Sequence, residues 1–85
     1  MENPDVEAAV SSAIQKEQRE GHYLLERFRR KIKSYEKEYK MDTEAFVDQF
    51  DRGELEDSED FFEWRALYKS VKHWEEKVKT LEKAS

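Results

Sequence analysis

Two histidines and many glutamates are the side chains of this sequence that could hold a metal ion. His22 and His73 stand far apart, and neither belongs to a His-x-x-x-His pair, so a zinc site would need carboxylates from several elements. A di-iron helical bundle uses a Glu-x-x-His motif, but the residues three positions before the histidines are Arg19 and Ser70. We therefore expect no metal and no cofactor.

The acidic run at residues 51–60 invites comparison with calcium-binding loops. An EF-hand loop carries oxygen ligands at positions 1, 3 and 5, whereas a loop that begins at Asp51 has Gly53 and Leu55 at the last two of these. The pattern therefore fails, and a solvated acidic turn that contains helix caps accounts for the same residues. The sequence does not decide whether this turn has a weak affinity for divalent ions.

Residues suited to catalysis are scarce. The two glycines, Gly21 and Gly53, are isolated from each other and form no phosphate-binding loop. No serine lies in a nucleophile motif, and the absence of cysteine excludes disulfides and thiolate zinc sites. We therefore expect that the protein is not an enzyme.

Residues 27–33 are the strongest candidate for nucleic-acid binding, because basic side chains on a helix face can contact phosphates. The chain nevertheless has a net charge of −5, and residues 41–63 carry −9. The basic block at residues 27–40, which carries +5, is therefore expected to pair with this acidic block. The side chains that could contact phosphates are Arg27, Arg29, Arg30 and Lys33.

The composition bounds the class of protein. The chain has 85 residues, of which 44% are charged, and it contains no apolar run near the roughly 20 residues of a membrane-spanning helix. The first residues are acidic and precede no apolar core, so they do not read as a signal peptide, and we expect a cytoplasmic protein. Aromatic residues make up 13% of the chain, which argues against disorder. A small core without disulfides favours oligomerisation.

The first helix is predicted from its caps and its apolar spacing. Asn3 suits an N-cap, and Pro4 suits the first helical position. An apolar stripe with spacings of 3 and 4, typical of one helix face, then runs through Leu25, Phe28, Ile32, Tyr35 and Tyr39. The two interpretations are a continuous helix of about 36 residues and a short helix hinged near Gly21. We favour the continuous helix, in which residues 23–40 are well formed and residues 1–22 extend it or fray.

A short second helix is predicted over residues 43–51. Asp42 or Thr43 is suited to cap it, because both carry a side-chain oxygen that can accept from the first free N–H groups. Gly53 falls just past the last apolar position, where a helix commonly ends in a left-handed residue.

A third helix is predicted over residues 58–83, capped by Asp57 or Ser58. No segment alternates apolar and polar side chains as a strand does, so we predict an all-α fold. The single domain, residues 1–85, is expected to be a long antiparallel helical hairpin with a short helix between its arms, self-associating as a helical bundle or coiled coil. The aromatic residues expected to meet at one end are Phe46, Phe50, Phe61, Phe62 and Trp64.

The middle of the chain resembles a known class of small proteins. Residues 39–55 read YKMDTEAFVDQFDRGEL, and residues 60–68 read DFFEWRALY. This pattern resembles small prokaryotic antitoxin-like proteins, the partners of small toxins in toxin–antitoxin pairs. The resemblance covers less than half of the chain, and it implies a cytoplasmic, non-catalytic protein that binds another protein.

We therefore predict a non-catalytic protein-binding module that dimerises and sequesters a partner, such as a small basic toxin, through an acidic and aromatic surface. The residues predicted to contact the partner are Asp57, Glu59, Asp60, Phe62, Glu63 and Trp64. The residues predicted to mediate self-association are Leu25, Phe28, Ile32, Tyr35 and Tyr39. One alternative is a self-assembling scaffold that uses the same stripe, and a less favoured one is a nucleic-acid-binding protein that uses residues 27–33.

Overall fold

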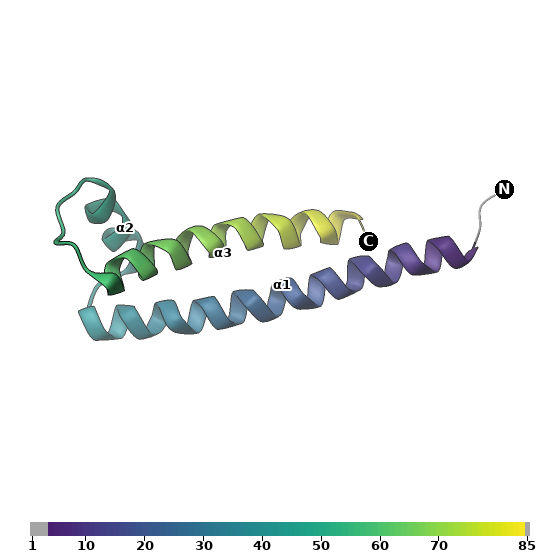
Figure 1. The fold of residues 1–85 in the computed structure, drawn as a ribbon, viewed down its shortest axis with the longest axis horizontal. Helices are drawn as coiled ribbons and strands as arrows, with labels where there is room; N and C mark the ends of the chain where they lie inside the picture. Colours follow the sequence, from purple (N-terminus) through teal and green to yellow (C-terminus); the bar gives the residue numbers. More distant parts are fainter. Residues whose placement is uncertain (1–3, 85) are drawn as a thin grey trace.

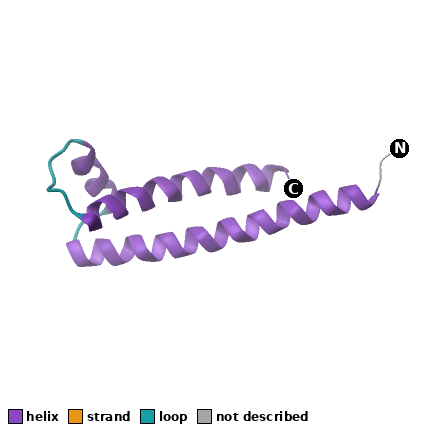
Figure 2. Cartoon of the chain, in the orientation of Figure 1, coloured by secondary structure: helices purple, strands orange, loops and turns teal. Residues whose placement is uncertain are grey.

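The computed structural model describes residues 4–84, which form three helices and no strand, and the all-α prediction is confirmed. The helices are α1 (Pro4–Tyr39), α2 (Thr43–Asp51) and α3 (Glu59–Ala84). Helices α1 and α3 lie side by side and run in opposite directions, and α2 lies at the end where α1 stops and α3 begins (Figure 1). The loops lie at that same end (Figure 2). The two long helices make the molecule a rod of 61 × 21 × 18 Å.

Helix α1 is continuous over 36 residues, so the interpretation with a hinge near Gly21 is wrong. Asn3, the predicted N-cap, lies outside the described residues. Gly21 is buried where α1 meets α3, and a Cβ atom there would lie 2.6 Å from Val78 Cγ2 and 3.3 Å from Trp74 Cε3. The glycine therefore permits close approach of two helices and does not interrupt one.

The end of α1 has an unusual backbone. Lys40 has a φ of 51°, in the left-handed region that glycine normally occupies at this position. The N–H of Met41 donates to the carbonyl of Glu36 at 3.2 Å, which closes the last turn. For a residue with a Cβ this conformation costs about 1–2 kcal/mol, and no glycine marks the turn in the sequence.

The ends of α2 follow the predicted chemistry. Asp42 is the N-cap, and its side chain accepts from the N–H of Glu44 at 2.9 Å. Gly53 has a φ of 72°, its N–H donates to the carbonyl of Phe50 at 3.0 Å, and the next N–H donates to the carbonyl of Gln49 at 3.0 Å. These two bonds form a Schellman motif, which satisfies carbonyl groups at the C-terminal end of the helix.

The core consists of two clusters along the rod. The first joins all three helices around Tyr35, Phe46, Phe61 and Trp64. Phe46 and Trp64 are 0% exposed, and their rings stack with centroids 3.9 Å apart and planes 3° from parallel. The second cluster joins α1 and α3 through Leu25, Val71 and Val78.

The stripe predicted to mediate self-association packs instead within the chain. Leu25 and Tyr35 are buried in the two clusters, and the remaining members, Phe28, Ile32 and Tyr39, are partly buried against those clusters. We therefore correct the expectation that this face meets a second copy. A helical stripe needs an apolar partner, and α3 of the same chain supplies it.

Gly21→Ala tests the close approach of the two long helices. Alanine gains about 1 kcal/mol in helix propensity, but forcing its methyl group against the buried Val78 side chain costs about 1–3 kcal/mol. We expect a net loss of up to about 2 kcal/mol in the free energy of unfolding, measured by urea denaturation. In a Val78→Ala background the same substitution should stabilise the protein. If Gly21→Ala stabilises the unaltered chain, the proposed steric role is wrong.

Candidate functional site

The structure divides the six predicted partner contacts into two groups. Asp60, Glu63 and Trp64 use their polar groups inside the chain. The other three, Asp57, Glu59 and Phe62, are exposed at the start of α3. Trp64 is fully buried, so its inclusion among the partner contacts is corrected.

Trp64 takes part in a hydrogen-bond chain that joins the three helices. Its indole N–H donates to the hydroxyl oxygen of Thr43 at 3.1 Å. The hydroxyl and the backbone N–H of Thr43 both donate to Oε2 of Glu36, each at 2.9 Å. The Glu36 carboxylate thus lies at the N-terminus of α2, where free N–H groups and the helix dipole favour negative charge.

Two tyrosines of α1 bond to carboxylates of α3. The hydroxyl of Tyr39 donates to Oδ2 of Asp60, and this hydrogen bond, with burial, raises the pKa of Tyr39 from 10.0 to about 12. Burial, followed by a hydrogen bond to Glu63, also raises the pKa of Tyr35. Glu63 has a lowered pKa because Lys31 and then Tyr35 donate to its carboxylate. These acids therefore hold α3 against α1, which leaves them poorly placed to bind a partner.

Among the predicted partner contacts that stay exposed, Phe62 is the large apolar side chain, and it is 55% exposed. Its ring packs edge-on against Phe50 of α2, with centroids 5.6 Å apart and planes at 88°. Glu59 lies one helical turn before Phe62, so both side chains point to the same side of α3. Asp51 lies across from them, where Arg65 donates to both of its carboxylate oxygens at 2.9 and 3.2 Å. We call Asp51, Asp57, Glu59 and Phe62 the Phe62 surface.

The predicted pairing between the basic and acidic blocks occurs only in part. Lys31 pairs with Glu63, but Arg29 pairs with Glu75, outside the acidic block, at 3.2 Å. The remaining basic residues of the block point away from α3 or carry only local contacts. They are Arg27, Arg30, Lys33, Lys37 and Lys40, and all are exposed.

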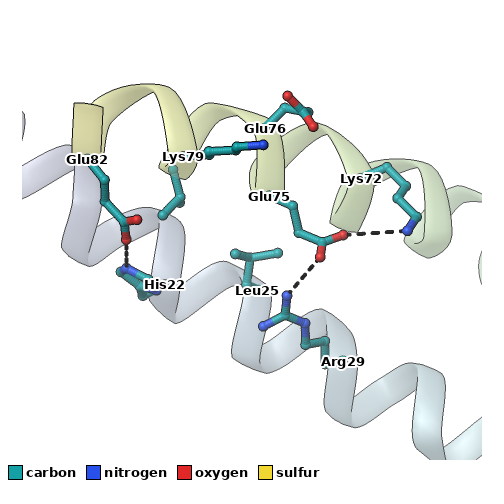
Figure 3. A pocket seen from close by; sticks show the side chains of 9 residues that line it. His22, Leu25, Arg29, Lys72, Glu75, Glu76, Lys79 and Glu82 are labelled. Atoms are coloured by element: carbon teal, nitrogen blue, oxygen red, sulfur yellow. Dashed lines mark hydrogen bonds and ion pairs between the residues drawn. The ribbon is translucent and has the colours of Figure 1, made fainter. Parts of the chain in front are cut away.

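An open groove of about 500 Å³ lies between α1 and α3, away from the Phe62 surface. Figure 3 shows His22 facing Glu82 and Arg29 facing Glu75 across it, and the closest atoms of the two pairs are 3.4 and 3.2 Å apart. The groove is thus lined by side chains that already contact one another across it. Within residues 4–84 no three histidine, aspartate or glutamate side chains are grouped so that they could hold a metal ion.

Thr43 and Glu36 are the residues that sequence reasoning missed. A buried tryptophan requires an acceptor for its indole N–H, so the prediction of a buried aromatic row could have prompted a search for one. The pattern alone does not identify which oxygen serves, because Thr43 and Glu36 lie on different helices from Trp64.

Comparison with protein-family models, with curated proteins and with solved structures finds no match to this chain. None of the helices within residues 4–84 is both long enough and apolar enough to span a bilayer.

Thr43→Val tests the hydrogen-bond chain, because valine keeps the shape of threonine but offers the Trp64 N–H no acceptor. A buried donor left unsatisfied costs about 1–3 kcal/mol, and we expect that loss in the free energy of unfolding, measured by circular dichroism in urea. Thr43→Ser, which keeps the hydroxyl, should lose less. A small loss for valine together with a larger loss for serine would show that the methyl packing of Thr43, and not the hydrogen bond, matters.

Tyr39→Phe tests the contact with Asp60 through its pH dependence. The pKa of Tyr39 is about 12 in the folded protein and 10.0 for a tyrosine without this contact, as in the unfolded chain. The hydrogen bond to Asp60 therefore stabilises the fold fully below pH 10, and this stabilisation is lost as the pH rises towards 12. We expect the melting temperature of the unaltered protein to fall more steeply over this range than that of Tyr39→Phe. Tyr23→Phe, an exposed position elsewhere on α1, is the matched control. Identical pH profiles for Tyr39→Phe and the unaltered protein would contradict the assignment.

Proposed function

We propose that this chain is a non-catalytic protein-binding module that binds a basic protein through the Phe62 surface. The observation that carries the proposal is a large aromatic ring, 55% exposed, next to carboxylates on a firmly packed part of the fold. Aromatic residues, phenylalanine among them, are enriched at the core of protein interfaces. An exposed phenylalanine beside acids therefore offers an apolar anchor with a charged rim.

The charge of this end of the molecule supports a basic partner. Residues 41–63 contain ten acidic and one basic side chain. Asp60 and Glu63 bond within the chain, but Asp57 and Glu59 remain exposed. Complementary charge accelerates the encounter of two proteins and disfavours partners of the wrong sign.

The support beneath Phe62 favours binding without rearrangement. Its ring rests on Phe50, which packs on Phe46 with ring centroids 5.6 Å apart. Phe46 in turn stacks on Trp64, which is fixed by the hydrogen bond to Thr43. A surface that is already ordered loses less conformational entropy on binding.

The resemblance to antitoxin-like proteins suggests a more specific partner, which is a small basic toxin. The acidic residues at the Phe62 surface would cover the phosphate-binding surface of that toxin. In this proposal the module sequesters its partner and does no chemistry of its own. His22 does not contribute, since it faces Glu82 near the C-terminal end of α3, away from the Phe62 surface.

Photo-cross-linking tests the Phe62 surface directly. A photoreactive phenylalanine analogue placed at Phe62 should capture a basic protein in cells of the source organism, identified by mass spectrometry. Tyr23 is the matched control, because it is also aromatic and is 58% exposed but lies outside this surface. Capture of the same proteins at both positions would contradict the proposal.

The captured protein, once purified, allows a second prediction. Phe62→Ala should weaken its binding by about tenfold or more, as expected for a central aromatic anchor. Glu59→Lys should weaken binding and reduce its dependence on salt. Lys79→Glu, a charge change elsewhere on α3, should leave the affinity unchanged. Titration calorimetry measures all three, and an unchanged affinity for Phe62→Ala would overturn the proposal.

A further inference from the structure

The two charged faces of α1 differ in what they contact. Arg29 and Lys31 pair with Glu75 and Glu63 of α3. On the opposite side of the helix, basic residues recur at spacings of 3 to 8 and are all exposed. With the aromatic residue among them, they are Lys16, Arg19, Tyr23, Arg27, Arg30, Lys33 and Lys37, which we call the outer α1 face.

The outer α1 face lies opposite the stripe that packs on α3. At about 100° per residue, its members fall within roughly 60° of a line that points away from Leu25 and its neighbours. The acid within this face is Glu26, which approaches Arg30 at 3.9 Å, and Glu20 and Glu38 flank it. Six basic and one acidic side chain leave a strongly positive strip on a protein whose net charge is −5.

Most of these cations form no ion pair among the residues that the structure describes. In the part of the chain that the structure describes, no ion pair joins Lys16, Arg19, Lys33 or Lys37 to another side chain. Arg27 lies over the exposed ring of Tyr23, 5.9 Å from its centroid. The strip is therefore available to an external anion.

The shape of the strip fits an extended anion. From Lys16 to Lys37 a helix rises roughly 32 Å, close to one turn of a DNA duplex, which is about 34 Å. The helix is continuous over this length (Figure 1), and over much of it α3 packs against its other side. A duplex carries one negative charge for each ~1.7 Å of its axis, so several phosphates on the side that faces the protein lie along a strip of this length.

We propose that the outer α1 face binds the phosphate backbone of duplex nucleic acid without reading its sequence. Protein interfaces carry an apolar centre, and helices that bind lipid surfaces carry a wide apolar face. Tyr23 is the one large apolar side chain of this strip, which favours a polyphosphate over either. The inference goes beyond the Phe62 surface and does not depend on it, because the two surfaces share no residue.

Fluorescence anisotropy with a labelled 30-base-pair DNA duplex of mixed sequence tests the proposal on the full chain. With five to six phosphate contacts, the logarithm of the binding constant should fall with the logarithm of salt concentration with a slope of about −4.5 to −5.4. The test variant is Arg30→Gln/Lys33→Gln/Lys37→Gln, and its slope should be shallower by about 3. Its affinity at low salt should fall by at least about tenfold.

The matched control removes the same charge from exposed positions of α3, in Lys69→Gln/Lys79→Gln/Lys83→Gln. It should keep the slope of the unaltered protein, and circular dichroism should show both variants folded. No binding of the unaltered protein at 50 mM salt, a slope near zero, or equal losses in the control would overturn the proposal. So would tighter binding to anionic vesicles than to the duplex, or a change of oligomeric state in the test variant without DNA, since either would assign the face to a different occupant.

Discussion

The hydrogen bond between the Trp64 indole and the Thr43 hydroxyl is the contact on which the rest of the fold depends. Trp64 has no exposed surface, so its N–H needs an acceptor from within the protein. Thr43 supplies it only when α2 lies across the ends of the other helices, and Glu36 fixes Thr43 there through two further bonds. The position of α2 in turn determines where Phe46 stacks, and hence where the aromatic row ends at the surface in Phe62.

The charged side chains of this molecule divide into those that bond to groups of the same chain and those that face solvent. Acids that face α1 accept hydrogen bonds or pair with a lysine, as Asp60 and Glu63 do. Acids just before α3 and in its first turn face solvent, as Asp57 and Glu59 do. The basic side chains of α1 divide in the same way, with Arg29 and Lys31 turned inward and the others outward. The net charges of residues 27–40 and 41–63 therefore do not by themselves describe the outer α1 face and the Phe62 surface. The side of the helix on which each charged residue lies describes them better.

The helix limits could be predicted from the sequence because their signals are local. The Asp42 cap and the glycine at Gly53 lie within a few residues of the ends that they mark, and both occur as the pattern indicates. The partner of an apolar stripe is not local, so the spacing of Leu25 and its neighbours could not distinguish α3 from a second copy. Trp64 was placed among the partner contacts for the same reason, although the aromatic residues around it were expected to meet at one end of the hairpin. Gly21 and Lys40 could not be interpreted either, since one depends on Val78 across the interface and the other has no glycine to mark it.

The antiparallel course of α1 and α3 also implies an order in which the chain folds. Contacts at the α2 end join residues 21 positions apart, as between Tyr39 and Asp60, whereas His22 meets Glu82 across 60 positions at the other end. Closing the longer loop first costs about 1 kcal/mol more in chain entropy. We therefore expect pairing to start at the aromatic cluster and to proceed along the two helices away from it. Opening in the reverse order would separate the far ends of the two long helices first and the aromatic cluster last.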